Sequence, residues 1–401
     1  MIDPSRPEAA RLLVVARCRD WMGIARMPKA LQKAGFDAVA LCYPDTFLAK
    51  TRYVNSFYFF NADEHSDQEL FQIMARAIAD WKPHIVVPGD EPTVHVMHWA
   101  MQDRRAIDAV PEEVSNVIRR SLGSAGHLRS TINKNETCRV ALELGLRVPD
   151  QVLVRSPEEA LRFYLEHSGQ PVVMKAPHGW AGMGVRVCAN QRQLRAAFKE
   201  LNELKGIGPG MEDPTSLEPS ESGPNAAASN SHSLSAQRFV SGTSAIYSAV
   251  AVNGELLAGY CALKEKVYPA LTGPGTVVRF TEHPEIAATA RALIEHFQYN
   301  GFIEFCFIIE EKTSDAYLLE CNPRPAPIAS LGAQVAVDLC QALFRKLNGE
   351  AAPRPIFFRG GTLIALFPQE WRRDPESPLL RSDCHDVPWD DPELLKAIIE
   401  S

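Results

Sequence analysis

The stretch from Gly301 to Arg324, GFIEFCFIIEEKTSDAYLLECNPR, constrains the fold more than any other part of the chain. It predicts two strands joined by a short polar turn, because apolar runs flank the residues EEKTSD. Each predicted strand carries one carboxylate among apolar residues, Glu304 on the first and Glu320 on the second. With a three-residue turn at 311–313, an antiparallel register places Glu304 directly opposite Glu320.

Two facing carboxylates need a neutralising partner. Like charges across a ladder are destabilising, and burying them without compensation costs more still. A shared proton or a divalent cation resolves the conflict. Asn322 shares a face with Glu320 and adds an amide oxygen, which suits a hard cation such as Mg²⁺. Arg324 continues that face, and Pro323 and Pro325 end the ladder there. The alternative is two solvent-facing glutamates on half-exposed strands.

Composition bounds the class of protein. The 401 residues exceed one ordinary core, so two or three packed units are expected. A net charge of −7 argues against nonspecific nucleic-acid binding. Nine cysteines without a CxxC pair predict free thiols in a reducing compartment and give no zinc signal. No apolar run reaches the roughly 20 residues of a membrane span. The start of the chain does not fit a secretory signal, so a cytoplasmic location is the expectation.

The first part of the chain predicts a parallel α/β unit, because apolar strands alternate with amphipathic helices. Strands are expected at 11–16, 38–44 and 84–93, with one helix ending at Gly35 and another at 66–82. Ligands of such sheets collect at the carboxyl ends of the strands, where Asp90 and Glu91 lie. These two acids are candidates to hold substrate, although a solvated turn is an equally good interpretation. The GxGxxG fingerprint of dinucleotide-binding folds is absent.

A glycine-containing hairpin follows at 170–190, QPVVMKAPHGWAGMGVRVCAN. A strand ends in Lys175, a loop with three glycines follows, and a second strand begins at Val185. Backbone N–H groups of such a loop can approach anionic oxygens closely, and Lys175 would add a point charge beneath them. The stretch is not a Walker A motif, because neither GKS/T nor a helix comes next. A hairpin that binds no ligand is the alternative interpretation.

The remaining sequence divides the chain into three expected units, 1–122, 123–240 and 241–401. Residues 206–235 are rich in Ser, Pro, Gly and Asn, and are expected to form a disordered insertion or flexible loop. Asn253-Gly254 is a strong hairpin signal between two apolar strands. Helices are expected at 284–299 and 332–348, and the tail holds one strand and a short final helix.

Taken in order, these elements resemble the ATP-grasp superfamily of carboxylate–amine ligases over roughly residues 10–350. The run ECNPRP is similar to biotin carboxylase and carbamoyl phosphate synthetase members, and TGPGTVVRFTEHPEI to peptide- and amide-forming ligases. The resemblance implies an α/β (α+β) architecture. An N-terminal Rossmann-like domain would precede two α+β subdomains that clasp ATP between them.

The resemblance also implies roles for individual residues. It places ATP on two phosphate-contacting lysines, a loop and a hinge strand: Lys134 and Lys175; Gly179, Gly182, Met183 and Gly184; and Gln237, Arg238, Phe239 and Val240. One or two Mg²⁺ ions, with Mn²⁺ as an alternative, would bind Glu304, Glu320 and Asn322. Lys264 and Arg279 would neutralise the γ-phosphate and the acyl phosphate, and Arg324 would hold the substrate carboxylate or its phosphorylated form.

The activity implied is an ATP-dependent ligase that activates a small-molecule carboxylate as an acyl phosphate and couples it to an amine. Bicarbonate activation and a catalytically silent nucleotide-binding protein are the alternatives. A homodimer is one expectation, because dimers are common among members. The sequence departs from many members at Ser244, where a carboxylate usually serves the ribose hydroxyls. The residues that bind ribose, and the two substrates, are therefore not predicted.

Overall fold

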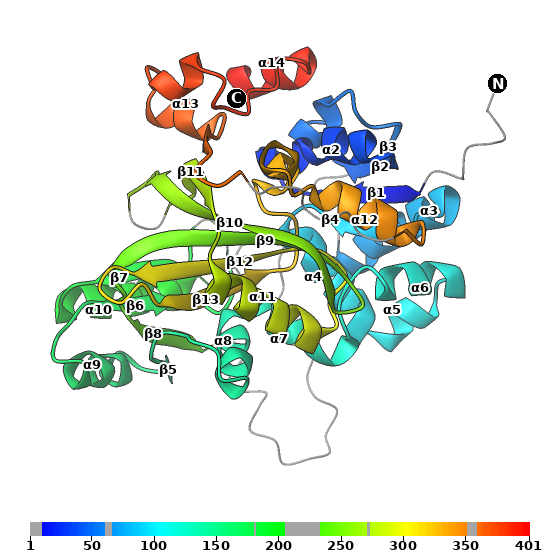
Figure 1. Ribbon diagram of the computed structural model, residues 1–401. Coiled ribbons are helices and arrows are strands. Elements are labelled where there is room, and N and C mark those ends of the chain that lie inside the picture. Colours follow the sequence, from blue (N-terminus) through cyan, green and yellow to red (C-terminus); the bar gives the residue numbers. More distant parts are fainter. Residues whose placement is uncertain (1–9, 61–65, 180–181, 205–232, 271–272, 351–358) are drawn as a thin grey trace, which may run out of the picture.

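A computed structural model describes residues 10–60, 66–179, 182–204, 233–270, 273–350 and 359–401 (Figure 1). The N-terminal part is a four-stranded parallel sheet in the order β3-β2-β1-β4, as the alternation of strands and helices predicts. Its strands are β1 (Arg11–Val15), β2 (Asp37–Cys42), β3 (Ser56–Phe59) and β4 (Ile85–Pro88). Its helices are α1 (Met22–Ala25), α2 (Met27–Ala34), α3 (Asp67–Trp81), α4 (Glu91–Gln102), α5 (Arg104–Asp108) and α6 (Glu112–Arg119), with a 3₁₀ turn at Phe47–Lys50.

The expected first helix is divided into α1 and α2. Pro28 lies in the first turn of α2 and has no N–H to bond the carbonyl of Ile24, so the helix cannot run through unbroken. Gly35 ends α2 with a φ of 106°, as predicted. The predicted strand at 84–93 is shorter, because α4 begins at Glu91 directly after the Asp90 cap.

A small antiparallel sheet follows in the order β5-β8-β6-β7. Its strands are β5 (Gln151–Val154), β6 (Val172–Lys175), β7 (Val185–Cys188) and β8 (Leu234–Arg238). Two helices pack on it, α9 (Pro157–Glu166) and α10 (Gln191–Glu203), while a 3₁₀ turn at Ala125–His127, α7 (Leu128–Ile132) and α8 (Lys134–Glu143) precede it. Most of the expected insertion at 206–235 lies outside the described residues. Its last two residues, Leu234 and Ser235, belong instead to β8.

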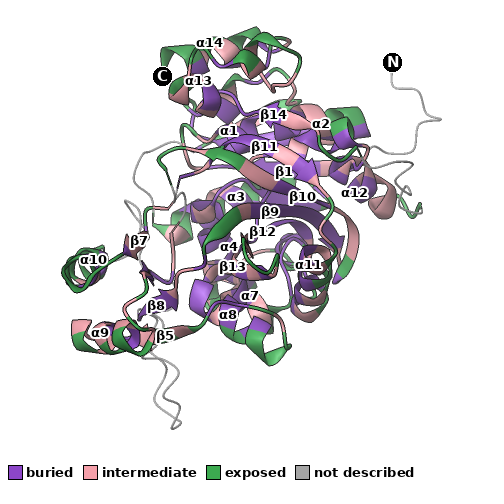
Figure 2. Cartoon of the chain, turned by 60° about the vertical axis from the view of Figure 1, so that its left-hand side comes forward, coloured by how far each residue is buried: buried purple, intermediate pink, exposed green. Residues whose placement is uncertain are grey.

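A six-stranded antiparallel sheet forms the centre of the molecule, in the order β13-β12-β9-β10-β11-β14. Its strands are β9 (Gly242–Val252), β10 (Glu255–Val267), β11 (Gly275–Thr281), β12 (Gly301–Glu310), β13 (Ala316–Asn322) and β14 (Leu363–Ala365). The predicted turn joins β9 to β10, with positive φ at both Asn253 and Gly254. Helix α11 (Pro284–Phe297) packs on one face of this sheet. Figure 2 shows buried residues along the central strands and exposed ones on α9 and α10.

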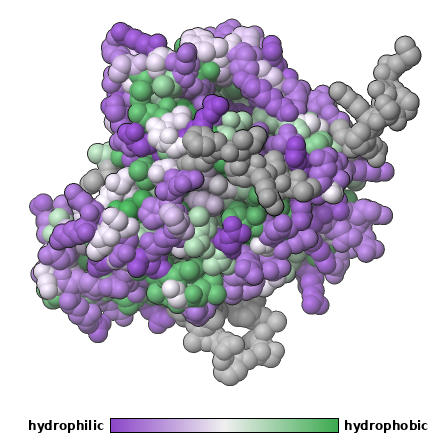
Figure 3. Space-filling view, viewed as in Figure 1, coloured by the Kyte–Doolittle hydropathy of each residue, from purple (hydrophilic) through white to green (hydrophobic). Residues whose placement is uncertain are grey.

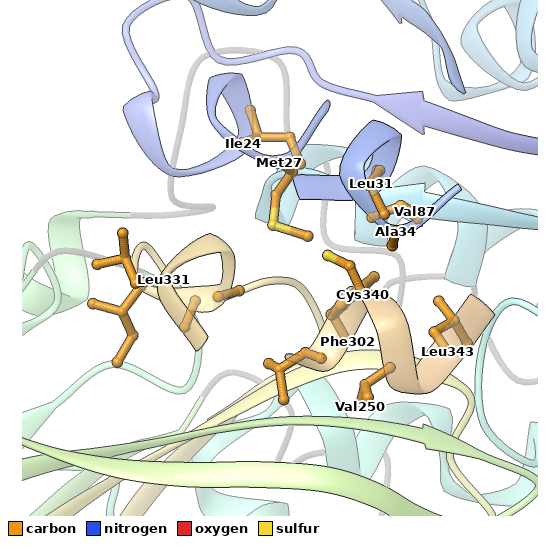
Figure 4. Close-up of a cluster of buried hydrophobic side chains, with 14 of the residues drawn as sticks. Ile24, Met27, Leu31, Ala34, Val87, Val250, Phe302, Leu331, Cys340 and Leu343 are labelled. Atoms are coloured by element: carbon orange, nitrogen blue, oxygen red, sulfur yellow. The ribbon is translucent and has the colours of Figure 1, made fainter. Parts of the chain in front are cut away.

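The other face of this sheet packs against the N-terminal part. Figure 4 shows α2 and α12 (Leu339–Leu347) meeting above the sheet, where Leu31 and Leu343 lie over Val250 and Phe302. The helix expected at 332–348 is in fact a 3₁₀ segment, Ala329–Val335, followed by α12. The strands of the three sheets lie within residues 11–88, 151–238 and 242–365. The expected boundaries between three units, at residues 122 and 240, remain a prediction.

The register of β12 and β13 differs from the prediction. Glu304 pairs with Asn322, and Glu320 pairs with Cys306, so the two glutamates are not directly opposite. The loop between the strands spans five residues, 311–315, instead of three, and the ladder is irregular after Cys306. The expected direct pair is therefore wrong by two positions, while the alternation keeps both glutamates on the same face.

The C-terminal segment packs back on the N-terminal part (Figure 1). It contains α13 (Gln369–Arg373), a 3₁₀ turn at Pro378–Arg381 and α14 (Pro392–Glu400), the short helix expected after Asp391. Arg26, between α1 and α2, donates to the carboxylate of Asp386 and to the carbonyl of Phe367. Burial opposes ionisation of both partners, lowering the pKa of Arg26 and raising that of Asp386.

Arg26→Met tests this anchor. The variant leaves the Asp386 carboxylate buried without its cation, so we expect the free energy of unfolding to fall by about 3 kcal/mol. Urea denaturation measures the loss. Arg381→Met is the matched control, because the pair of Arg381 with Glu376 is exposed and contributes little. A loss below about 1 kcal/mol in Arg26→Met would contradict the assignment.

The cysteines, the helices and the surface bear on the expectations drawn from composition. All nine cysteines are free, as predicted. In the part of the chain that is described, no helix is long and apolar enough to cross a membrane. On the face drawn in Figure 3, hydrophilic residues dominate the outline and hydrophobic ones gather nearer the middle.

Candidate active site

A cavity of about 510 Å³ lies between the small sheet and the central sheet. The small sheet and the hinge after it supply one wall: Val173, Lys175, Gly182, Val185, Val187, Gln237, Arg238, Phe239 and Val240. The central sheet supplies the other: Ser244, Ile246, Lys264, Glu304, Cys306, Ile308, Leu319, Glu320, Asn322 and Arg324. The loop after β1 and the C-terminal segment line the far end, through Asp20, Trp21, Met22, Leu366, Pro368, Gln369 and Arg372.

The three predicted metal ligands converge in this cavity. The Asn322 amide Nδ2 donates to Glu304 Oε1 at 2.9 Å and to Glu320 Oε1 at 3.4 Å. Glu304 is only 5% exposed, and its Oε2 is buried with no hydrogen-bond partner among the residues that the structure describes. A buried carboxylate oxygen without a donor is costly, and a divalent cation would satisfy it. The two glutamates therefore fit a hard cation, whereas Asn322 directs its NH2 group, and not the amide oxygen that would bind a metal, toward them. No cluster of three or more His, Cys, Asp or Glu suited to a metal is found among the described residues.

Lys134 links the three predicted metal ligands, Glu304, Glu320 and Asn322 (the metal set), to the glycine loop after β6. Its Nζ lies 3.0 Å from Glu320 Oε2 and also donates to the carbonyl of Gly179. Burial raises the pKa of Glu320, but the charge and hydrogen bond of Lys134 outweigh it, with smaller help from Lys175 and Lys264, and hold the pKa at about 2. Lys134, at the start of α8, is thus part of the site even though its sequence surroundings are unremarkable.

Lys175 ends β6 inside the cavity. It is 7% exposed and makes no ion pair with any residue in the described ranges. Burial lowers its pKa from the ordinary value, because the charged form is poorly solvated there. The loop beyond it has positive φ at Gly179 and Gly182, which glycine adopts without strain. Gly182 lines the cavity, Met183 is largely exposed, and Trp180 and Ala181 lie outside the described residues.

The hinge strand forms the apolar end of the cavity. Gln237 is held by Gln151, and Arg238 bonds Glu310 at 3.3 Å and lies over the ring of Tyr317. Valines of β6 and β7 and Leu319 face this end, which suits a planar base. Ser244 lines it as well, and the acids among the lining residues are Asp20, Glu304 and Glu320. Glu310, the carboxylate bound to Arg238, is not among the lining residues, so the described lining offers no hinge carboxylate to the ribose hydroxyls.

The two basic side chains expected at the γ-phosphate, Lys264 and Arg279, lie on opposite faces of the central sheet. Lys264 of β10 lines the cavity, but Arg279 of β11 does not and instead pairs with Glu265 at 2.5 Å. Lys264 lies opposite Val278, so Arg279, one residue further along, points to the other face of the sheet. The expectation that Arg279 joins Lys264 is therefore not met.

Arg324 lies beside the metal set, but its guanidinium already has a carboxylate partner. Its guanidinium bonds Glu91, at the start of α4, and Glu304 Oε1 lies 4.0 Å from its Nη1. Asp90 and Glu91 are the two acids expected at the carboxyl end of β4, and neither is among the lining residues of the cavity. Asp90 caps α4 by accepting from the backbone N–H of Thr93.

No known protein-family model matches the sequence, and no curated protein matches it. Solved structures do match. The biotin carboxylase domain of 2-oxoglutarate carboxylase from Hydrogenobacter thermophilus has a TM-score of 0.65 and 16% identity, covering 90% of this chain and 75% of that one. N5-carboxyaminoimidazole synthetase from Staphylococcus aureus has a TM-score of 0.60 and 12% identity, covering 92% of this chain and 87% of that one. L-amino acid ligase from Bacillus licheniformis has a TM-score of 0.56 and 13% identity, covering 87% of this chain and 79% of that one. The chain has the ATP-grasp fold.

The ATP-grasp fold confirms the fold class expected from the sequence. Reasoning from the sequence missed the far end of the cavity, which Trp21 and the C-terminal residues Leu366 and Arg372 help to form. A signal existed for Trp21, because it follows the first strand at the sheet edge where ligands collect. The C-terminal contribution had no local signal, since it depends on long-range packing.

The Lys134–Glu320 pair predicts a pH dependence. The pKa of Glu320 lies below its ordinary value, so the stabilisation is present above about pH 4.5 and is lost as the pH falls toward 2. Lys134→Met should lower the free energy of unfolding by about 1–2 kcal/mol at pH 7, a modest value because Glu320 is 24% exposed. The deficit should shrink at pH 3. An equal deficit at both pH values, measured by urea denaturation, would contradict the coupling; Lys346→Met is the surface control.

Proposed function

We propose that the chain is an ATP-dependent ligase that activates a carboxylate as an acyl phosphate and couples it to an amine. The observation that carries the proposal is a single cavity in which Lys175, Lys264 and Arg324 surround the oxygen ligands Glu304 and Glu320. Cations and metal ligands along the walls of one cavity are what phosphoryl transfer requires, because the reaction depends on positioning and charge neutralisation.

The chemistry proceeds in two balanced steps. A carboxylate oxygen attacks the γ-phosphorus of ATP, the bond to the β–γ bridging oxygen breaks, and ADP leaves. The amine then attacks the carbonyl carbon of the acyl phosphate, loses a proton, and expels inorganic phosphate. In this proposal Lys175 contacts the α- and β-phosphates of ATP and Lys264 neutralises charge on the γ-phosphate; both side chains line the cavity. Trp21 and Leu366, which line the far end, would limit the access of water to the anhydride.

Mg²⁺, or Mn²⁺ in its place, would be held by Glu304, Glu320 and Asn322. When bound, it supplies Lewis-acid neutralisation of the phosphate oxygens. The nucleotide base would lie at the apolar hinge end, against Phe239 and Val240. Small-molecule substrates and a homodimeric state belong to the same proposal.

An ADP-release screen tests the activity. Pooled carboxylates are combined with pooled amines in the presence of ATP and Mg²⁺, and ADP is measured for each pair of pools. ADP formation that needs both pools supports the ligase. ATP binding by calorimetry without ADP from any pair supports a catalytically silent nucleotide-binding protein instead.

Activation of bicarbonate is the second candidate. Two of the matching structures are a biotin carboxylase domain, solved with MgADP and bicarbonate, and N5-carboxyaminoimidazole synthetase with ADP. Both have higher TM-scores than the L-amino acid ligase. ADP formation that depends on bicarbonate and needs no organic acid would favour this candidate over the first.

A further inference from the structure

Arg324 is held along one edge of its guanidinium. Its Nε and Nη2 donate to Glu91 Oε1 at 2.8 and 2.5 Å, and its Nη1 donates to the carbonyl of Pro325 at 3.2 Å. A guanidinium carries five N–H donors. One hydrogen therefore remains on each of Nη1 and Nη2, and because Glu91 occupies the Nε–Nη2 edge, the free Nη2 hydrogen lies on the end-on edge formed by Nη1 and Nη2. Arg324 is 4% exposed and lines the cavity, and the end-on edge is the edge that Glu91 leaves for a ligand.

The face of the same guanidinium is also fixed. Its Cζ lies 5.1 Å from the centre of the Trp21 ring, a cation–π arrangement. Trp21 comes from the loop after β1 and lines the cavity. Nη1 lies 4.0 Å from Glu304 Oε1, so the end-on edge lies beside the metal set. Two residues of the N-terminal part, Glu91 and Trp21, thus set the direction of a side chain that follows directly after β13 of the central sheet.

Glu91 itself rests on a rigid support. The preceding residue, Asp90, is buried, and its Oδ2 accepts from the backbone N–H groups of Arg17 and Cys18 at 2.5 and 2.7 Å. Its Oδ1 accepts from the backbone and side chain of Thr93. The start of α4 is therefore tied to the loop that carries Trp21. A group positioned this way keeps its orientation when a ligand arrives.

We propose that Glu91 is a positioning residue which, with the ring of Trp21, presents the end-on edge of Arg324 to the planar oxyanion of the substrate to be activated. A carboxylate and bicarbonate both offer two coplanar oxygens that match this edge bidentately. The inference rests on the proposed function for its chemistry. Without Glu91, the acid left beside Arg324 is Glu304, and the guanidinium would turn toward it and lose its direction.

Glu91→Gln tests the role with little change in shape. The KM for the activated acid found in the screen should rise about 10- to 100-fold, because a charge-assisted pair that orients Arg324 is lost. The affinity for ADP without divalent cation should stay within about twofold. Glu91→Asp, which keeps the charge on a shorter stem, should restore part of the loss. Glu255→Gln is the matched control, since it removes a surface pair with Lys346 of similar length.

A double-mutant cycle shows whether Glu91 acts through Arg324. In an Arg324→Gln background, Glu91→Gln should have no further effect on KM. An effect of full size in that background, or an unchanged KM in the parent enzyme, would overturn the proposal. If Glu91→Gln lowers the melting temperature too far for kinetics, Glu91→Asp carries the same cycle, and it too must lose its effect in the Arg324→Gln background.

A spectroscopic test needs no substrate. Release of the guanidinium from the indole should change tryptophan emission in Glu91→Gln, and the change should be absent when Trp21→Phe is combined with it, although five other tryptophans remain. Unchanged emission in Glu91→Gln would overturn the positioning role. A screen without ADP formation would instead refute the proposed function, and the emission test would still decide the placement of Arg324.

Discussion

Replacing Glu320 with alanine is expected to lower ADP formation by about 1,000-fold or more while the chain still folds. Glu320 shares the Asn322 amide with Glu304 and carries the negative charge that Lys134 balances. Its removal leaves one carboxylate for the cation and leaves Lys134 without its acid. Because Glu320 is partly exposed, the free energy of unfolding should fall by only about 1 kcal/mol.

Two measurements separate loss of the metal site from loss of the fold. Binding of Mn²⁺ in the presence of ADP, followed by electron paramagnetic resonance, should weaken together with ADP formation, while the melting temperature changes by only a few degrees. Glu311→Ala is the control, because Glu311 lies exposed in the loop between β12 and β13 and should change neither. Full turnover with Mg²⁺ in Glu320→Ala would refute the metal assignment.

The sequence predicts the elements of the site better than their mutual placement. Lys175 at the end of a strand and Glu304 and Glu320 on neighbouring strands follow from local apolar patterns and alternation. These patterns depend on near neighbours in the chain, so one sequence is enough to identify them. The sheet order of the N-terminal part is similarly local, because short connections between parallel strands leave few topologies.

Register and face were harder to predict. The pairing of Glu304 with Asn322 depends on a five-residue loop and an irregular ladder, neither of which has a signal in the letters EEKTSD. Arg279 was assigned to the cavity by its position in a motif, but one step along a strand reverses the face. The bond between Arg324 and Glu91 joins residues 233 positions apart, and only the packed structure brings them together.

Replacing Lys175 with methionine should have opposite effects on stability and on nucleotide binding. Lys175 is buried in the cavity without an ion pair to any described residue, and burial lowers its pKa, so its charge is costly to the folded chain. Methionine fills nearly the same volume without charge. The melting temperature of the nucleotide-free protein should therefore hold or rise by a few degrees. The affinity for ATP should fall about 10- to 100-fold, because a point charge beneath the phosphates is gone.

Calorimetric titration with MgATP and thermal unfolding give the two readings on the same samples. Lys199→Met on α10 is the matched control, because its side chain is 80% exposed and far less constrained, and it should change neither quantity. Unchanged ATP affinity would exclude Lys175 from the phosphate site. A large fall in melting temperature would show instead that Lys175 stabilises the fold, since a buried cation retained only for binding should not be needed for folding.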